Sequence, residues 1–177
     1  MIKKILTGIL IASATLALAG CGSKETKNLV PINQTSLAIN IPQQAQPIPN
    51  LLVPSFTGVE LLKAYKIMPD QSCSIQKTKF KDTTTDLPLA YLKTLESFFP
   101  GFKLEDLGNQ KLQCDNQNYE IFLTTFAIPH TNKTYYFYQA IIPSHNKGEL
   151  IIVSCQATQP SQDLAKIVYN INCLKNE

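Results

Sequence analysis

The chain has no arginine and no tryptophan, although it contains 16 lysines and 13 acidic residues in its 177 positions. Arginine grips phosphate and carboxylate groups through two parallel hydrogen bonds, and lysine does not replace it in that geometry. The formal net charge is also small, at +3. We therefore expect no nucleic-acid partner, because binding a phosphate backbone requires clustered positive charge.

The common catalytic and cofactor signatures are missing as well. The sequence contains no glycine-rich phosphate loop, no G-x-S-x-G turn and no H-E-x-x-H zinc motif. His130 and His145 fall in two predicted turns at opposite ends of one predicted strand, so we do not expect them to share a metal. Glu105 and Asp106 are neighbours in the chain, and neighbouring positions do not converge as a general acid and base must. The sequence thus predicts no catalytic residue, no cofactor, no metal and no enzyme.

An apolar run long enough to cross a membrane is absent too, yet a shorter run lies near the N-terminus. Two lysines in residues 1–4 precede the uncharged, mostly apolar segment Ile5–Leu18, whereas a membrane-spanning helix needs about 20 residues. This order is typical of a cleavable signal peptide. The residues Leu18-Ala19-Gly20-Cys21 resemble the lipobox of bacterial lipoproteins. That resemblance implies cleavage after residues 1–20 and a diacylglyceryl group on Cys21.

Lipid on Cys21 would hold the chain on a membrane of the bacterial cell envelope. Each buried methylene contributes about 0.8 kcal/mol, so two or three acyl chains make the attachment effectively permanent. Gly22 follows the modified cysteine, in place of the aspartate that retains enteric lipoproteins. By that analogy we expect the outer membrane, with the domain facing the periplasm. Cleavage also removes Lys3 and Lys4, which leaves 14 lysines against 13 acidic residues.

Apart from Cys21, the chain has four cysteines, which are Cys73, Cys114, Cys155 and Cys173. An even number in an exported chain favours two disulfides. Zinc binding and free buried thiols are the alternatives, although no C-x-x-C pair is present. The final helix is expected to run back along the strand of Cys155, which puts Cys173 about 10 Å out of step with it. A disulfide needs Cα atoms within about 7 Å, so we disfavour that pair and leave the other two connectivities open.

Turn residues and hydrophobic periodicity divide the chain into a polar segment, Gly22–Gln34, and a single domain over residues 35–177. The polar segment is expected to be a flexible tether. Helices are predicted from Asp86 to about Phe99 and from Ser161 to Leu174, each behind a capping residue. Val59–Ile67 fits a short helix slightly better than a strand. The predicted strands are Leu37–Ile41, Ser74–Phe80, Lys111–Cys114, Tyr119–Ile128, Thr134–Ile142 and Glu149–Ala157.

The predicted strands carry apolar residues on both faces. In the strand Glu149–Ala157, Leu150 and Ile152 point one way while Ile151 and Val153 point the other. A sheet wet on one side would show polar residues at every second position, so we expect both faces to be covered. Short connections make the sheet mainly antiparallel. The expected fold class is α+β, a mainly antiparallel sheet with helices packed on both faces.

Four segments carry a resemblance to a known family. They are Leu37-Ala38-Ile39-Asn40-Ile41-Pro42, Tyr135-Tyr136-Phe137-Tyr138, Leu150-Ile151-Ile152-Val153 and Leu164-Ala165-Lys166-Ile167-Val168. Their order resembles the PsbP-like fold, an α/β/α sandwich, and among bacterial lipoproteins it is similar to the DcrB-type family. The chain departs from that family in lacking the aromatic residue often found after the first proline. The resemblance implies a small domain used for protein contact or assembly support in the envelope, with no catalytic residues to carry over.

The sequence therefore predicts a non-enzymatic, membrane-anchored envelope lipoprotein that acts as a protein-contact or assembly module. Its expected partners are the membrane, through lipid on Cys21, and an envelope protein. The alternative is a periplasmic carrier of lipid or another small ligand, or an envelope enzyme with a site assembled from scattered residues. A carrier needs a cavity between sheet and helices, whereas a contact module has a filled core and an exposed patch. The aromatic run at residues 135–138 would form such a patch or, more often, core on one face.

Overall fold

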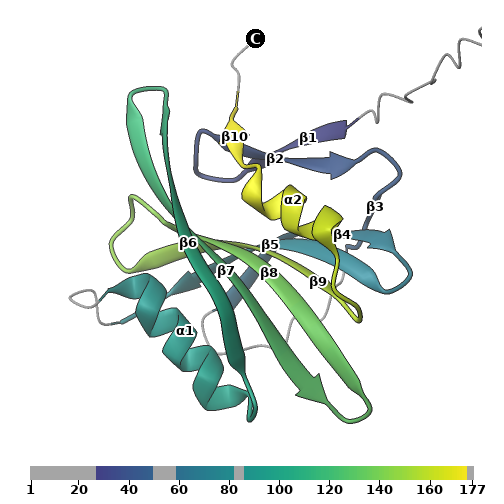
Figure 1. Ribbon diagram of the computed structural model, residues 1–177. Helices are drawn as coiled ribbons and strands as arrows, with labels where there is room; N and C mark the ends of the chain where they lie inside the picture. The colour runs from purple at the N-terminus through teal and green to yellow at the C-terminus, as the bar shows by residue number, and fades with distance from the viewer. Residues whose placement is uncertain (1–26, 50–58, 82–85, 175–177) are drawn as a thin grey trace, which may run out of the picture.

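The computed structural model describes residues 27–49, 59–81 and 86–174 (Figure 1). The signal peptide, the lipobox with Cys21 and the first part of the expected tether lie outside these residues. The helices are α1 (Leu87–Phe98) and α2 (Gln162–Tyr169). The strands are β1 (Lys27–Ile32), β2 (Leu37–Pro42), β3 (Gln46–Pro47), β4 (Val59–Met68), β5 (Gln71–Lys79), β6 (Lys103–Cys114), β7 (Gln117–His130), β8 (Lys133–Pro143), β9 (Glu149–Ala157) and β10 (Asn172–Cys173).

The strands form a large sheet in the order β3-β4-β5-β9-β8-β7-β6 and a small sheet in the order β1-β2-β10. Every strand pair in the described residues is antiparallel. The turn between β6 and β7 holds Asp115 and Asn116 at positive φ values of 49° and 64°. Aspartate and asparagine adopt this conformation more readily than other side chains. These two residues therefore end β6 and start the hairpin.

The large sheet is covered on both faces, which confirms the predicted α+β fold class. α2 and the small sheet pack on one face, and α1 packs on the other (Figure 1). β9 lies inside the large sheet and is buried from Glu149 to Cys155. Its Ile151 and Val153 belong to the core beneath α2, while Leu150 and Ile152 belong to the core beneath α1.

The predicted starts of the helices are confirmed by their caps. The Asp86 carboxylate accepts a hydrogen bond from the backbone N–H of Leu89 at 3.3 Å. The Ser161 hydroxyl accepts one from the backbone N–H of Leu164, also at 3.3 Å. Each side chain thus satisfies one of the donors that a helix leaves unpaired at its N-terminus.

The second helix is shorter than the predicted range Ser161–Leu174. α2 ends at Tyr169, and Asn172–Cys173 forms β10 against β2. Asparagine is a weak helix former because its side chain bonds to nearby backbone. Here the Asn172 amide donates to the backbone carbonyl of Asn170 at 2.7 Å. Local asparagine chemistry and pairing with β2 together end the helix early.

The tether predicted over Gly22–Gln34 was wrong in its second half. β1 occupies Lys27–Ile32 and pairs along its whole length with β2. Its Val30 is 7% exposed and Ile32 is fully buried. In the sequence, polar neighbours obscure the alternation of buried and exposed side chains in β1. The strand that pairs with it, β2, lies further along the chain.

β4 is a strand where a helix was slightly favoured over Val59–Ile67. It pairs with β5, with a register shift between Leu61 and Lys63. A bulge of this kind breaks the strict alternation of side chains and so obscures the strand pattern. β6 is likewise longer than predicted, because it begins at Lys103 instead of Lys111. Its added part is largely polar, as suits the edge of the large sheet.

Candidate functional site

A pocket of about 520 Å³ lies between α1 and the face of the large sheet that α1 covers. We call it the α1 pocket. Its floor comes mainly from β5, β7, β8 and β9, and its wall from α1 and the residues that follow it. The lining is mostly apolar. We call its polar side, on β5, β9 and Gln139 of β8, the polar half, and its aromatic side, on β7, β8 and α1, the aromatic half.

The polar half arises because alternate residues of neighbouring strands share one face of a sheet. Ser74 lies opposite Ser154, which in turn lies opposite Gln139. Thr124 lies opposite Gln139 on the next strand. We call these four residues the polar row, since they cross four adjacent strands. The polar side chains that line the α1 pocket are Ser72, Ser74, Gln76, Gln139, Ser154 and Gln156.

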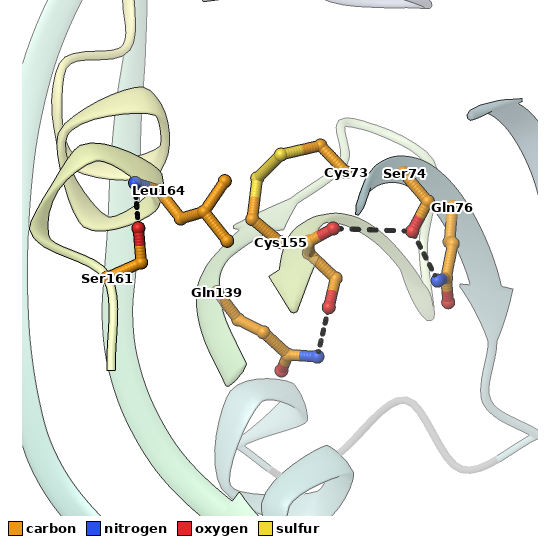
Figure 2. Close-up of a disulfide and its surroundings, with 8 residues drawn as sticks. Cys73, Ser74, Gln76, Gln139, Cys155, Ser161 and Leu164 are labelled. Carbon is orange, nitrogen blue, oxygen red and sulfur yellow. Dashed lines mark hydrogen bonds between the residues drawn. A yellow bond between two sulfur atoms is a disulfide. The ribbon is translucent and has the colours of Figure 1, made fainter. Parts of the chain in front are cut away.

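Hydrogen bonds hold much of this polar lining in place (Figure 2). Gln139 Nε2 donates to Ser154 Oγ at 3.0 Å and to the Tyr91 hydroxyl at 3.2 Å. On β5, Gln76 Nε2 donates to Ser74 Oγ at 2.8 Å. The Gln139 residue is 4% exposed. Its amide is therefore a fixed, buried group on the pocket floor.

Two buried atoms of the polar row have no hydrogen-bond partner among the described residues, Gln139 Oε1 and Thr124 Oγ1. An unpaired buried polar group costs about 1–3 kcal/mol. Turning the Gln139 amide over would exchange its two ends and still leave one unpaired, because Tyr91 and Ser154 contact a single end. Both atoms are enclosed by protein, so a molecule in the α1 pocket would not reach them.

The aromatic half brings together rings from α1 and from β7 and β8. Phe126 and Phe137 stack with their ring centroids 5.0 Å apart, and Phe102 tilts against Phe126 at 4.9 Å. Phe98, at the end of α1, is 55% exposed and so forms the solvent side of the pocket. The aromatic side chains of the lining are Tyr91, Phe98, Phe99, Phe126, Tyr135 and Phe137.

The aromatic run at residues 135–138 is shared between the two faces of the large sheet. Tyr135 and Phe137 line the α1 pocket, while Tyr136 and Tyr138 pack in the core beneath α2. The Tyr138 hydroxyl accepts a hydrogen bond from the backbone N–H of Ser161 at 2.7 Å. The run is thus core on one face and part of a binding pocket on the other.

The chemistry available in the α1 pocket is hydrogen bonding and ring packing. Burial raises the pKa of Tyr91 to about 12, against a smaller opposing effect of the hydrogen bond with Gln139. The Tyr91 hydroxyl is therefore neutral at physiological pH. Among the described residues that line the pocket there is no carboxylate, lysine or cysteine. The imidazole of His130 has the Tyr135 ring as its neighbour, at a centroid distance of 6.4 Å.

The candidate cysteines pair within the described residues as Cys73–Cys155 and Cys114–Cys173. Cys73 and Cys155 lie opposite each other on β5 and β9, with Cα atoms 4.0 Å apart. They face α2, away from the α1 pocket, and Figure 2 shows Leu164 pointing from α2 toward them. The disfavoured pair, Cys155–Cys173, is not formed. The helical path assumed for Cys173 was nevertheless wrong, because α2 ends before it.

The other candidate residues lie apart from one another. His130 ends β7, and His145 lies in the turn after β8, where its Nε2 contacts Gln117 Oε1 at 3.2 Å. Glu105 is an exposed residue of β6. Within the described ranges, no group of three or more histidine, cysteine or acidic residues could hold a metal ion. No helix there is both long and apolar enough to cross a bilayer.

Solved structures identify the architecture, although no protein-family model and no curated protein matches the chain. The solution structure of cyanobacterial PsbP (CyanoP) from Synechocystis sp. PCC 6803 has a TM-score of 0.52 at 14% identity, covering 88% of this chain and 98% of that chain. The chain has the PsbP-like fold. The Saccharomyces cerevisiae Ran-binding protein Mog1p has a TM-score of 0.51 at 10% identity, covering 85% of this chain and 96% of that one. These identities show the fold alone, and membership of the DcrB-type family stays a prediction.

The sequence did not single out the residues of the α1 pocket, although it carries a signal for them. Ser72, Ser74 and Gln76 alternate along β5, and Ser154 and Gln156 alternate along β9. In both strands the intervening positions are largely apolar and buried beneath α2. A period of two in polar residues within otherwise buried strands indicates a polar surface enclosed by the fold.

Proposed function

We propose that the chain is a non-enzymatic lipoprotein of the bacterial envelope, anchored by lipid on Cys21, whose domain binds a small uncharged molecule in the α1 pocket. The signal-peptide and lipobox patterns support the anchor. The observation that carries the binding role is the pocket of about 520 Å³ beside α1, lined by aromatic rings on one side and by the half-buried Ser72, Gln76 and Gln156 on the other. Small-molecule sites typically have volumes of about 300–1,000 Å³ and a few convergent polar groups.

The α1 pocket favours the role of a small-ligand carrier, which was the alternative prediction from the sequence, over the role of a protein-contact module. A contact module is expected to have a filled core and an exposed apolar patch. The face of the large sheet beneath α2 is packed with buried side chains. The face beneath α1 is packed in part and leaves the pocket beside the helix. Protein contact is the second candidate, since a protein of the same fold, Mog1p, is a Ran-binding protein.

Filling the polar half of the pocket tests the proposed function. We expect Ser72→Phe to weaken ligand binding at least tenfold, because its ring would occupy the space above β5. Gln71→Phe is the matched control, since the next side chain on the strand points to the opposite face. Gln156→Trp fills the same half from β9 and replaces Ser72→Phe if that variant fails to fold.

Binding is measured by equilibrium dialysis of the full-length protein against uncharged oligosaccharides, nucleosides and monoacylglycerols. The proposal expects at least one of these to bind the wild-type protein and Gln71→Phe, and to be lost from the filled variant. If no compound distinguishes the filled variant from its control, the small-ligand role is wrong.

A further inference from the structure

The small sheet has one face packed on the core and one face turned away from it. Val30 and Ile32 of β1 and Ile39 of β2 belong to the core beneath α2. Because side chains alternate along a strand, the neighbouring residues of these strands point to the opposite face. We call this face the outer face, and its exposed or half-buried residues are Leu29, Pro31, Asn40, Pro42 and Asn172. The small sheet lies on the side of the large sheet opposite α1 (Figure 1).

The outer face is uncharged and in part apolar. Leu29 is 46% exposed there, and Pro31 beside it is exposed as well. The range 27–49, which contains β1 and β2, has no aspartate or glutamate. A carboxylate is costly to move out of water and is repelled by anionic lipids. The outer face can approach a lipid surface without either cost.

The expected lipid anchor lies next to this sheet in the chain. Six residue steps separate Cys21 from Lys27, the first residue of β1, and they span at most about 22 Å. The layer of α1 is further away by two layer spacings of about 10 Å each. An anchor on Cys21 therefore holds the small sheet, and not α1, next to the bilayer. Anchoring also keeps the local concentration of the domain at the lipid surface high, so a weak contact is sufficient to orient it.

We infer that the outer face of the small sheet lies against the phospholipid headgroups of the membrane, with Leu29 inserted among them. This inference rests on the lipid anchor of the proposed function and adds the orientation of the domain. Water is excluded from the exposed apolar surface of Leu29 in this contact, which favours it. The occupant of the outer face is thus a lipid surface.

The contact of the small sheet also orients the α1 pocket. Lys63 Nζ donates to the backbone carbonyl of Pro31 at 3.3 Å and so ties β1 to β4 of the large sheet. The α1 pocket lies on the opposite face of the large sheet. It is therefore on the side away from the membrane, and its ligand comes from the aqueous phase.

The absence of tryptophan allows the orientation to be measured by fluorescence. Leu29→Trp places a single indole on the outer face. Leu89→Trp is the matched control, because Leu89 is 47% exposed on α1, against 46% for Leu29. Each lipid-modified protein is reconstituted into vesicles of phosphatidylcholine and phosphatidylglycerol, with and without dibrominated phosphatidylcholine. Bromine quenches an indole only at close range, so we expect at least threefold greater fractional quenching in Leu29→Trp than in Leu89→Trp.

The role of the native leucine is measured with Pro31→Trp as the reporter, since Pro31 is exposed on the same face. Adding Leu29→Asp to this variant should lower its quenching by brominated lipid at least twofold, because the new carboxylate resists leaving water. Adding Leu89→Asp instead is the control and should leave the quenching unchanged. Pro31→Trp also replaces Leu29→Trp in the first comparison if that variant fails to fold.

The outcomes separate this inference from the anchor on which it rests. If the wild-type protein fails to float with the vesicles and its Cys21 carries no lipid by mass spectrometry, the anchor and the membrane contact are both wrong. If the protein floats but the two tryptophans are quenched equally, the anchor stands and the orientation is wrong. If the indole of Leu29→Trp is shielded from iodide yet not quenched by brominated lipid, a second copy of the chain covers the outer face, and the lipid contact is wrong.

Discussion

Gln139 shows how a polar side chain within an apolar run comes to lie on the floor of the α1 pocket. Its amide is buried, held at one end by Tyr91 and Ser154, and unpaired at the other end within the described residues. In the sequence it is one polar residue inside a long apolar and aromatic run. Its position on the pocket floor depends on the register of β8 with β7 and β9.

Tyr91 provides a prediction about alkaline pH. Burial raises its pKa to about 12 in the folded protein, whereas an unfolded chain has the ordinary value near 10. The contribution to stability is complete below pH 10. As pH rises from about 10 to 12, the unfolded state loses the proton first, so the free energy of unfolding falls. The full effect is on the order of 3 kcal/mol.

This effect is measured by chemical unfolding at pH 9 and pH 11 in the wild-type protein and in Tyr91→Phe. The variant lacks the titrating hydroxyl, so its free energy of unfolding should fall less between the two pH values. Equal falls in the two proteins would show that burial of Tyr91 does not govern this pH dependence.

At the scale of elements, the disulfides reinforce different parts of the fold. Cys73–Cys155 joins β5 to β9, which the strand ladder already holds together. Cys114–Cys173 joins β6 to β10, a two-residue strand at the end of the described chain. Their sequence separations of 82 and 59 residues predict similar entropic contributions, since loop entropy varies with the logarithm of length. The two disulfides differ chiefly in how easily a reductant in the solvent can reach their sulfur atoms.

Brief treatment with dithiothreitol should therefore open Cys114–Cys173 first. Cys173 is partly exposed, whereas Cys73 and Cys155 are 1% and 0% exposed. Alkylation followed by peptide mapping measures the order of opening. Labelling of Cys73 and Cys155 as early as Cys173 would contradict it. The double variant Cys114→Ala/Cys173→Ala should lose about 2–4 kcal/mol of unfolding free energy and keep the other disulfide.

Helices and strands were predictable where the residues that indicate them lie in or next to the element. The capping residues Asp86 and Ser161 indicate the helix starts, and turn residues with β-branched runs indicate β7, β8 and β9. β1, β4 and the end of α2 were wrong or undecided because partner strands decide them. A strand such as β1 gains its ladder from β2, and no residue within it records that partner.

The whole molecule places its folded domain close to the expected anchor. β1 begins at Lys27, so six residue steps separate it from Cys21, and they reach at most about 22 Å. This is a shorter tether than the segment Gly22–Gln34 would provide. A domain anchored through Cys21 would therefore keep the small sheet near the membrane.

The anchor itself is tested by Cys21→Ser. We expect loss of metabolic labelling with an alkyne fatty acid and release from the membrane fraction, because serine cannot form the thioether. Ser23→Ala is the control, since it leaves the cysteine in place and should be labelled normally. Membrane retention of Cys21→Ser equal to wild type would refute the lipoprotein prediction.

The sequence by itself determined the α+β class, the two-sided cover of the large sheet and the starts of the helices. Caps, turns and apolar periodicity act over a few residues and can be read without a partner. Only the tertiary structure decided which cysteines pair, where β1 and β10 lie and that a pocket exists. Those features depend on register between distant strands, which brings Ser74, Ser154 and Gln139 side by side beneath α1.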